Sequence, residues 1–205
     1  VDVVTYSASS VALLLMRAVP PPTGAERPSV ARIAEGARYA WNRKDLLGTY
    51  VVDLTAMLFA FPYALFPFVA ASYDAPWALG LLYSAPYAGS LVATLTSGWT
   101  SHVHHHGRMI VWAAIGWGAS IAAFGLSPSL GWALFFLCLA GAADMVSGLF
   151  RSLMWNLTIP DELRGRMAGI ELLSYSLGPN VGQLRASVMA ELTSLRTSLW
   201  AGGVL

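Results

Sequence analysis

The stretch LGWALFFLCLAGAADMVSGLF, residues 130–150, decides the fold class, because Asp144 is its only charged residue. A helix needs roughly 20 mostly apolar residues to cross a bilayer, and this stretch is long enough. Four more stretches meet the same requirement: 47–72, 77–99, 109–126 and 167–192, the last being the most polar. The sequence therefore predicts an all-α membrane protein, a polytopic bundle of helices.

The composition excludes an ordinary soluble domain. Charged residues make up 11% of the 205 residues and hydrophobic residues 56%, whereas a soluble domain carries about 25% charged residues. The net charge of +1 gives no support for nucleic-acid binding. A single cysteine, Cys138, excludes a disulfide within the chain and a thiol metal cluster. We interpret it as a small buried hydrophobe.

Both ends of the chain lie in apolar runs that are too short to span a bilayer. Residues 3–16 lack the basic start and the cleavage pattern of a signal peptide, so they are interpreted as the tail of an earlier helix. Residues 198–205 are interpreted as the start of a later helix. We therefore expect the chain to be a fragment of a longer protein.

The basic residues alternate between the predicted linkers. Ten of the twelve Lys and Arg residues fall in linkers 17–46, 100–108 and 151–166, and none falls in 73–76 or 127–129. The positive-inside rule places the three basic linkers in the cytoplasm. The two exceptions are Arg185, which we expect to snorkel to the membrane surface, and Arg196, which we expect in the last loop.

The longest linker, 17–46, has two parts. Its proline run at 20–22 must be irregular. Residues 29–41 are then predicted to form an amphipathic helix on the inner membrane surface, with apolar side chains on one face. The simplest role is a tether between two bundles, and a regulatory or lipid-sensing role is the alternative.

Three acidic residues lie inside the apolar stretches: Asp53, Asp144 and Glu171. Each costs roughly 2.5–3.5 kcal/mol at the centre of a membrane helix, so such residues usually face a cavity or a partner. With a rise of about 1.5 Å per residue, all three lie at a similar depth, roughly 10 Å below the inner surface. One layer of acids indicates a gate or a proton site. For Asp53 and Asp144, static ion pairs or helix-packing hydrogen bonds are the alternative.

Two of the predicted spans carry a polar stripe on one helix face. The first stripe is Tyr83, Tyr87, Ser90, Thr94 and Ser97, and the second is Glu171, Tyr175, Gly178, Gly182 and Gln183. Such stripes are expected to line a cavity, or alternatively to let helices pack closely through small residues.

Prolines interrupt three spans, at Pro62, Pro67, Pro86 and Pro179. Each removes a backbone hydrogen bond. The span that holds both Pro62 and Pro67 is therefore a good candidate to flex.

The run HVHHH at 102–106 invites a metal-site interpretation. A catalytic metal site normally adds ordered partners around its ligands, so we interpret the run as a weakly basic cytoplasmic loop. The sequence holds no phosphate-binding loop, nucleophile elbow or hydrolase carboxylate pair. We therefore expect no enzyme activity, no metal and no cofactor.

Two loops resemble those of the major facilitator superfamily. Residues 97–99 (SGW), with 107–108 (GR), resemble its loop between helices eight and nine, although His102 replaces the acid and Val103 the arginine of the usual pattern, and the spacing is two residues longer. A role for that acid is therefore not carried over.

Residues 160–169 (PDELRGRMAG) resemble the loop between helices ten and eleven in the branch that includes enterobactin exporters and macrolide efflux proteins. Residues 141–144 (GAAD), followed by Arg151 and Trp155, fit the same branch.

The resemblance implies two six-helix bundles that rock against each other in alternating access, usually with proton antiport. Residues 1–16 would end helix six, 17–46 would link the bundles, and 47–205 would form the C-terminal half from helix seven to the start of helix twelve. The expected function is proton-coupled efflux of amphipathic small molecules, such as a siderophore or a drug, across a bacterial inner membrane. The expected partners are the small-molecule substrate, protons, the lipid bilayer and the N-terminal bundle.

The expected substrate cavity consists of Tyr83, Tyr87, Ser90, Thr94, Tyr175 and Gln183. The expected proton-coupling and inner-gate residues are Asp53, Asp144, Glu171, Arg151, Arg164 and Arg166. A membrane scaffold without transport activity, or a metalloprotein built on the histidine run, are the alternative functions.

Overall fold

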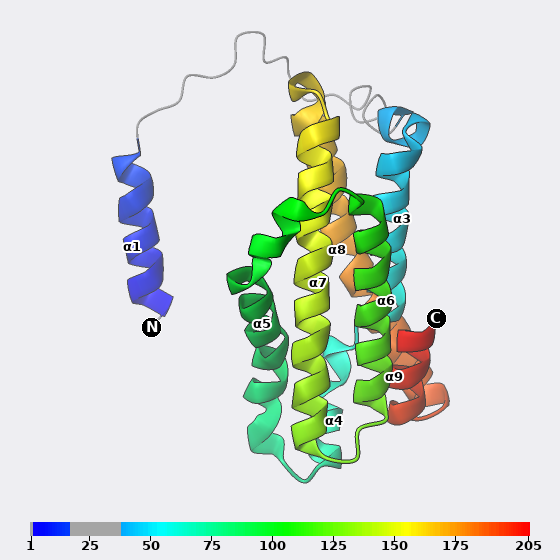
Figure 1. Cartoon of the computed structure of the whole chain (residues 1–205). Helices are drawn as coiled ribbons and strands as arrows, with labels where there is room; N and C mark the ends of the chain where they lie inside the picture. The colour runs from blue at the N-terminus through cyan, green and yellow to red at the C-terminus, as the bar shows by residue number, and fades with distance from the viewer. Residues whose placement is uncertain (1, 17–37) are drawn as a thin grey trace. The chain divides into compact units, whose positions relative to one another are not determined.

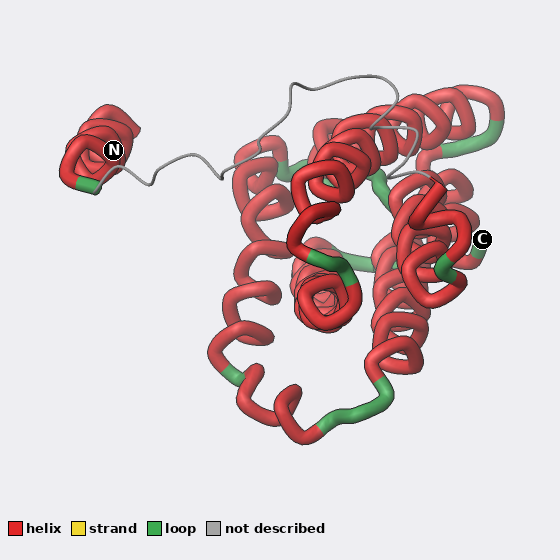
Figure 2. Tube along the Cα trace, turned by 90° about the horizontal axis from the view of Figure 1, so that it is seen from above, coloured by secondary structure: helices red, strands yellow, loops and turns green. Residues whose placement is uncertain are grey.

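The computed structural model describes residues 2–16 and 38–205, which divide into two compact units, 1–30 and 31–205. The first unit contributes helix α1 (Asp2–Leu15). Every described element is a helix or a loop (Figure 2). The predicted all-α fold class is therefore confirmed for the described part of the chain.

The second unit is a bundle of helices joined by short turns (Figure 1). Its elements are α3 (Lys44–Phe59), η1 (Tyr63–Leu65), α4 (Phe66–Ser72), η2 (Pro76–Ala78), α5 (Leu79–Leu95), η3 (Ser97–His102), α6 (His106–Gly125), α7 (Leu130–Thr158), α8 (Asp161–Leu192) and α9 (Leu195–Val204).

Four segments of the described chain are long and apolar enough to cross a membrane: Lys44–Ser72, Pro76–Leu95, His106–Gly125 and Leu130–Thr158. They match the first four predicted spans. The fifth predicted span, 167–192, lies within the continuous helix α8. By composition α8 does not reach the same apolarity, because it carries Glu171, Arg185 and several Ser, Asn and Gln residues.

The first span is broken where the sequence placed its prolines. Helix α3 ends at Phe59, and Pro62 precedes η1. Pro67 then lies in the first turn of α4, where its missing N–H costs nothing. In contrast, Pro86 and Pro179 lie inside the continuous helices α5 and α8. Of these four prolines, the two in the first span are therefore the ones that lie at a break between helices.

Helix α7 is the central element of the bundle and packs against α5 and α6 (Figure 1). It crosses α5 so closely that a Cβ at Gly141 would overlap the Pro86 carbonyl, and a Cβ at Gly89 would overlap the backbone of Cys138. Close crossing through small residues is a general way of packing helices in membranes. On the other side of the bundle, Gly182 brings α8 equally close to Met57 of α3.

The segment predicted as a linker at 151–166 is helical except for a short break at Ile159 and Pro160. Helix α7 continues past Arg151 to Thr158, and α8 begins at Asp161. The predicted boundary was wrong because a charged residue, Arg151, was taken to mark the end of an apolar stretch. A buried ion pair, described below, keeps this residue inside the helix.

The segments with basic residues gather at one end of the second unit. In Figure 1, the start of α3, the segment from η3 to α6 and the turn between α7 and α8 lie toward its upper end. The turns after α4 and after α6 lie at the opposite end. Most of the predicted amphipathic helix at 29–41 lies outside the described residues, and residues 38–42 are helical.

Candidate functional site

Helices α3 and α7 are joined by a buried ion pair between Asp53 and Arg151. Asp53 is 7% exposed and Arg151 4% exposed. The guanidinium of Arg151 also lies over the ring of Tyr175 on α8, 5.8 Å from the ring centre. Removing two charges from water is costly and is offset only by close mutual contact. The pair therefore fixes α3, α7 and α8 around one buried cation.

Two further acids surround the same cation. Asp144 precedes Arg151 by seven residues, which is two turns along the same face of α7. Asp144 lines the same narrow crevice as Asp53. Glu171 precedes Tyr175, whose ring lies under the Arg151 guanidinium, by one turn of α8. The side chain of Asp144 is exposed and that of Glu171 is half-buried. We call Asp53, Asp144, Arg151 and Glu171 the polar layer.

The polar layer is unbalanced, since one arginine faces three acids. Only Asp53 forms a direct ion pair with Arg151 among the described residues. The Nε of Arg151 is buried without a hydrogen-bond partner in the described structure. The Nε of Arg151 can therefore still donate a hydrogen bond. Asp144 and Glu171 lie beside Arg151 without forming a direct ion pair with it in the described structure.

The structure brings together four of the six predicted gate residues. Arg164 lies in the first turn of α8, where it is exposed and donates to the Asn156 carbonyl at 3.4 Å. Arg166 belongs to α8, but its side chain lies outside the described part of the structure. Sequence spacing could not separate Arg164 from Arg151, because most of the predicted linker is helix.

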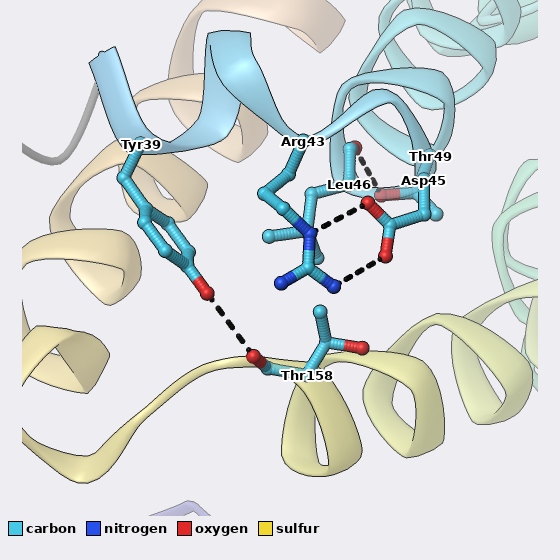
Figure 3. Close-up of polar contacts among 6 residues, drawn as sticks. All are labelled: Tyr39, Arg43, Asp45, Leu46, Thr49 and Thr158. Carbon is cyan, nitrogen blue, oxygen red and sulfur yellow. Dashed lines mark hydrogen bonds and ion pairs between the residues drawn. The ribbon is translucent and has the colours of Figure 1, made fainter.

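Contacts between α3 and α7 continue from the polar layer toward the end of α7 at Thr158. Trp155 Nε1 donates to Thr49 Oγ1 at 3.2 Å, and the rings of Trp155 and Tyr50 lie 5.1 Å apart. Tyr39 Oη donates to the Thr158 carbonyl at 3.2 Å (Figure 3). Tyr39 lies in the helical segment 38–42 that precedes α3, so this segment and α3 together cover the last turns of α7.

An exposed ion pair lies beside this helical segment. The guanidinium of Arg43 donates to both carboxylate oxygens of Asp45, at 3.1 and 2.8 Å (Figure 3). Both side chains face solvent, at 43% and 39% exposure, so water screens this pair far more than the Asp53–Arg151 pair.

A cavity of about 70 Å³ lies between α5, α6, α7 and the broken end of the first span. Two predicted cavity residues, Tyr87 and Ser90, line it. The aromatic residues Phe61, Tyr63 and Trp117 line it as well, together with Asp144. We call this the aromatic cavity.

Sequence reasoning missed these three aromatic residues because they lie on separate segments. Phe61 and Tyr63 follow the helix break, and Trp117 lies on α6. Their rings form one wall: Phe61 stacks on Tyr63 at 4.5 Å and meets Trp117 edge-on at 6.4 Å. The sequence did show Pro62. The helix break expected there was the one signal that residues 61–63 could line a cavity.

The polar stripe on α5 serves two purposes. Ser90 Oγ donates to the Gly141 carbonyl at 2.9 Å, which supports the close-packing interpretation at that position. Thr94 Oγ1 donates to the backbone of its own helix at 2.8 Å. Tyr83 Oη donates to the Tyr63 carbonyl at 3.2 Å and thereby holds the segment after the helix break.

The predicted stripe on α8 is divided in the same way. Gly178 and Gly182 contact Met57 of α3, so they serve helix packing. Tyr175 is 42% exposed and faces the Arg151 guanidinium, and Gln183 is half-buried. Of the predicted cavity residues on α8, Tyr175 is thus the one that contacts the polar layer.

The expectation that Arg185 snorkels to the membrane surface was wrong. Arg185 is half-buried, and its guanidinium donates to the Phe59 carbonyl at 2.5 Å while lying 5.8 Å from the centre of the Phe59 ring. Phe59 is the last residue of α3, where carbonyls lose their partners within the helix. The break after Phe59 therefore gives Arg185 a hydrogen-bond acceptor within the bundle.

The described residues hold no group of three or more His, Cys, Asp and Glu side chains arranged to bind a metal ion. His106 instead packs its ring 5.9 Å from the ring of Phe150. Cys138 is a half-buried free thiol on α7.

The fold and the site define a polytopic helical membrane protein with charged groups buried between its helices. The chain is similar to enterobactin exporters. It is 29% identical over 181 residues to the enterobactin exporter EntS of Shigella flexneri, which covers 87% of the chain and 41% of that protein.

Two further relatives carry the same name. The enterobactin exporter of Citrobacter koseri is 25% identical over 94% of the chain and 46% of the relative, and that of Escherichia coli O81 is 26% identical over 90% and 44%. The chain matches no family model and no solved structure. It spans less than half the length of these relatives. The predicted resemblance to the enterobactin-exporter branch of the major facilitator superfamily is thus confirmed.

Proposed function

We propose that the chain forms the C-terminal half of a secondary transporter in a bacterial inner membrane. It would export amphipathic small molecules, such as a siderophore or a drug, by alternating access of two helical bundles. The similarity to named exporters over about nine-tenths of the chain supports efflux. The gathering of the basic segments at one end supports a cytoplasmic position for that end.

The polar layer is the observation that carries this proposal. A purely structural bundle gains little from placing three acids and one arginine between membrane helices, because each charge is expensive there. Such groups instead mark ion and proton pathways. In our proposal Asp144 and Glu171 exchange protons during the cycle, while Asp53 holds Arg151 between them.

Export by the complete open reading frame tests the proposal. Everted membrane vesicles should accumulate a siderophore or a drug when a proton gradient is imposed, and an uncoupler should abolish the accumulation. Asp144→Asn and Glu171→Gln should each reduce proton-driven flux at least about tenfold, as expected when a proton-transfer group is lost. Asp45→Asn, which alters the exposed acid of α3, is the matched control. Unchanged flux in Asp144→Asn, Glu171→Gln and Asp53→Asn would contradict proton coupling through the polar layer.

The export assay, together with a measurement of bound metal, separates the alternative functions. A membrane scaffold would move no substrate in any arm of the experiment. A metalloprotein built on residues 102–106 would lose its activity and its metal when His104 and His105 are both changed to Ala. Under our proposal, that double variant transports at a near-normal rate.

A further inference from the structure

The aromatic cavity and the polar layer share residues. Asp144 and Trp117 line the aromatic cavity, and both also line a narrow crevice that reaches Asp53. Asp144 therefore stands between the ion pair and the aromatic wall. It has no direct ion-pair partner among the described residues, since Arg151 is engaged by Asp53.

The walls of the cavity combine rigid and accessible aromatic rings. Trp117 is 8% exposed and is held by its edge-on contact with Phe61. Tyr87 is 68% exposed and stands at the open side. Tyr63, Tyr87 and Asp144 line this one small cavity, so the two phenol rings and the carboxylate lie near one another.

Aromatic faces carry negative electrostatic potential and attract organic cations, and they do so most strongly where water is excluded. A carboxylate beside such faces adds a full negative charge and repels anions. The volume of about 70 Å³ suits one group of a larger molecule rather than the whole molecule.

We infer that the aromatic cavity binds a positively charged group of the transported molecule, such as a substituted ammonium on an apolar body. Asp144 is its counter-ion, and Tyr63, Tyr87 and Trp117 form its aromatic walls. This inference rests on the proposed export function and adds a substrate class to it.

Binding of two small probes of opposite charge tests the inference. Radiolabelled benzyltrimethylammonium is titrated onto the product of the complete open reading frame in lipid nanodiscs, and benzylsulfonate is tested as a competitor. The chain should bind the ammonium and ignore the sulfonate. Asp144→Asn should weaken binding at least about tenfold, as expected when one partner of a charge pair is removed. Asp144→Glu, which keeps the charge, should retain most of the affinity.

A second pair of variants keeps the test decisive if Asp144→Asn fails to fold. Tyr87→Leu removes an exposed ring and should weaken binding by about three- to tenfold, whereas Tyr87→Phe keeps the ring and should bind normally. Asp45→Asn should bind as the unaltered chain does. Equal binding by the unaltered chain and the folded Asp144→Asn variant, or competition by the sulfonate, would overturn the inference.

The binding and export experiments distinguish a failure of the cation site from a failure of the export function. If vesicles export a neutral siderophore while the chain fails to bind the ammonium, the cation site is wrong and export stands. If the chain binds the ammonium while vesicles move no substrate, export is wrong and the cation site stands.

Discussion

Arg151 is the residue on which the arrangement of α3, α7 and α8 depends most strongly. Its guanidinium is buried, pairs with Asp53 and lies over Tyr175. We predict that Asp53→Asn lowers the free energy of unfolding by about 3–5 kcal/mol, because it leaves a buried cation without its counter-charge. Unfolding of the chain in mixed micelles measures this loss.

Two control variants separate the ion pair from simple packing. Asp53→Leu combined with Arg151→Met should be more stable than either single variant, since a buried pair replaced by apolar groups is often nearly neutral. Asp45→Asn breaks only an exposed pair and should unfold like the unaltered chain. A double variant that is less stable than both singles would show that the charges themselves are not the cause.

Arg185 stabilises the break in the first span by satisfying the Phe59 carbonyl. We predict that Arg185→Leu lowers the free energy of unfolding by about 1–3 kcal/mol, because a half-buried carbonyl at the end of α3 loses its donor. Hydrogen exchange of the backbone around residues 59–66 should also become faster. Arg196→Leu, at an exposed position on α9, is the matched control. Unchanged exchange in Arg185→Leu would contradict a capping role.

At the scale of helices, the crossing of α5 and α7 depends on Gly141, whose missing Cβ leaves room for the Pro86 carbonyl. We predict that Gly141→Ala separates the two helices and lowers the free energy of unfolding by about 1–3 kcal/mol, as overpacking does elsewhere. Gly131→Ala, on the same helix but facing open space, should leave stability unchanged or raise it by at most about 1 kcal/mol. Equal effects at both positions would contradict the close crossing.

The sequence predicts the positions of the helices better than it predicts the contacts between them. Hydropathy located the first four spans, and Pro62 located the helix break, because both are properties of neighbouring residues. The pairing of Asp53 with Arg151 depends instead on how α3 packs against α7, two helices that are far apart along the chain. The aromatic cavity was half predicted: Tyr87 and Ser90 share a helix stripe, whereas Phe61 and Trp117 meet only in the folded bundle.

At the scale of the whole second unit, the polar layer lies nearer to one end of the bundle than to the other. From Arg151, helix α7 continues only to Thr158 before the turn to α8, while its other end at Leu130 is much farther away. Trp155 contacts α3, and Tyr39, in the helical segment before α3, contacts Thr158, so this short side of α7 is covered. Which side of the membrane this end faces therefore decides whether the polar layer titrates with the cytoplasm in our proposal.

We predict that the end with the basic segments faces the cytoplasm. The chain is first made cysteine-free by Cys138→Ala, and single cysteines are then introduced by Ser101→Cys in η3 and by Ser129→Cys in the turn between α6 and α7, both exposed positions. In intact spheroplasts a membrane-impermeant maleimide should label position 129 and spare position 101, because Lys and Arg are retained on the cytoplasmic side. Permeabilised spheroplasts should show labelling at both positions, which controls for access. Labelling of position 101 alone in intact spheroplasts would reverse the orientation and place the polar layer toward the outside.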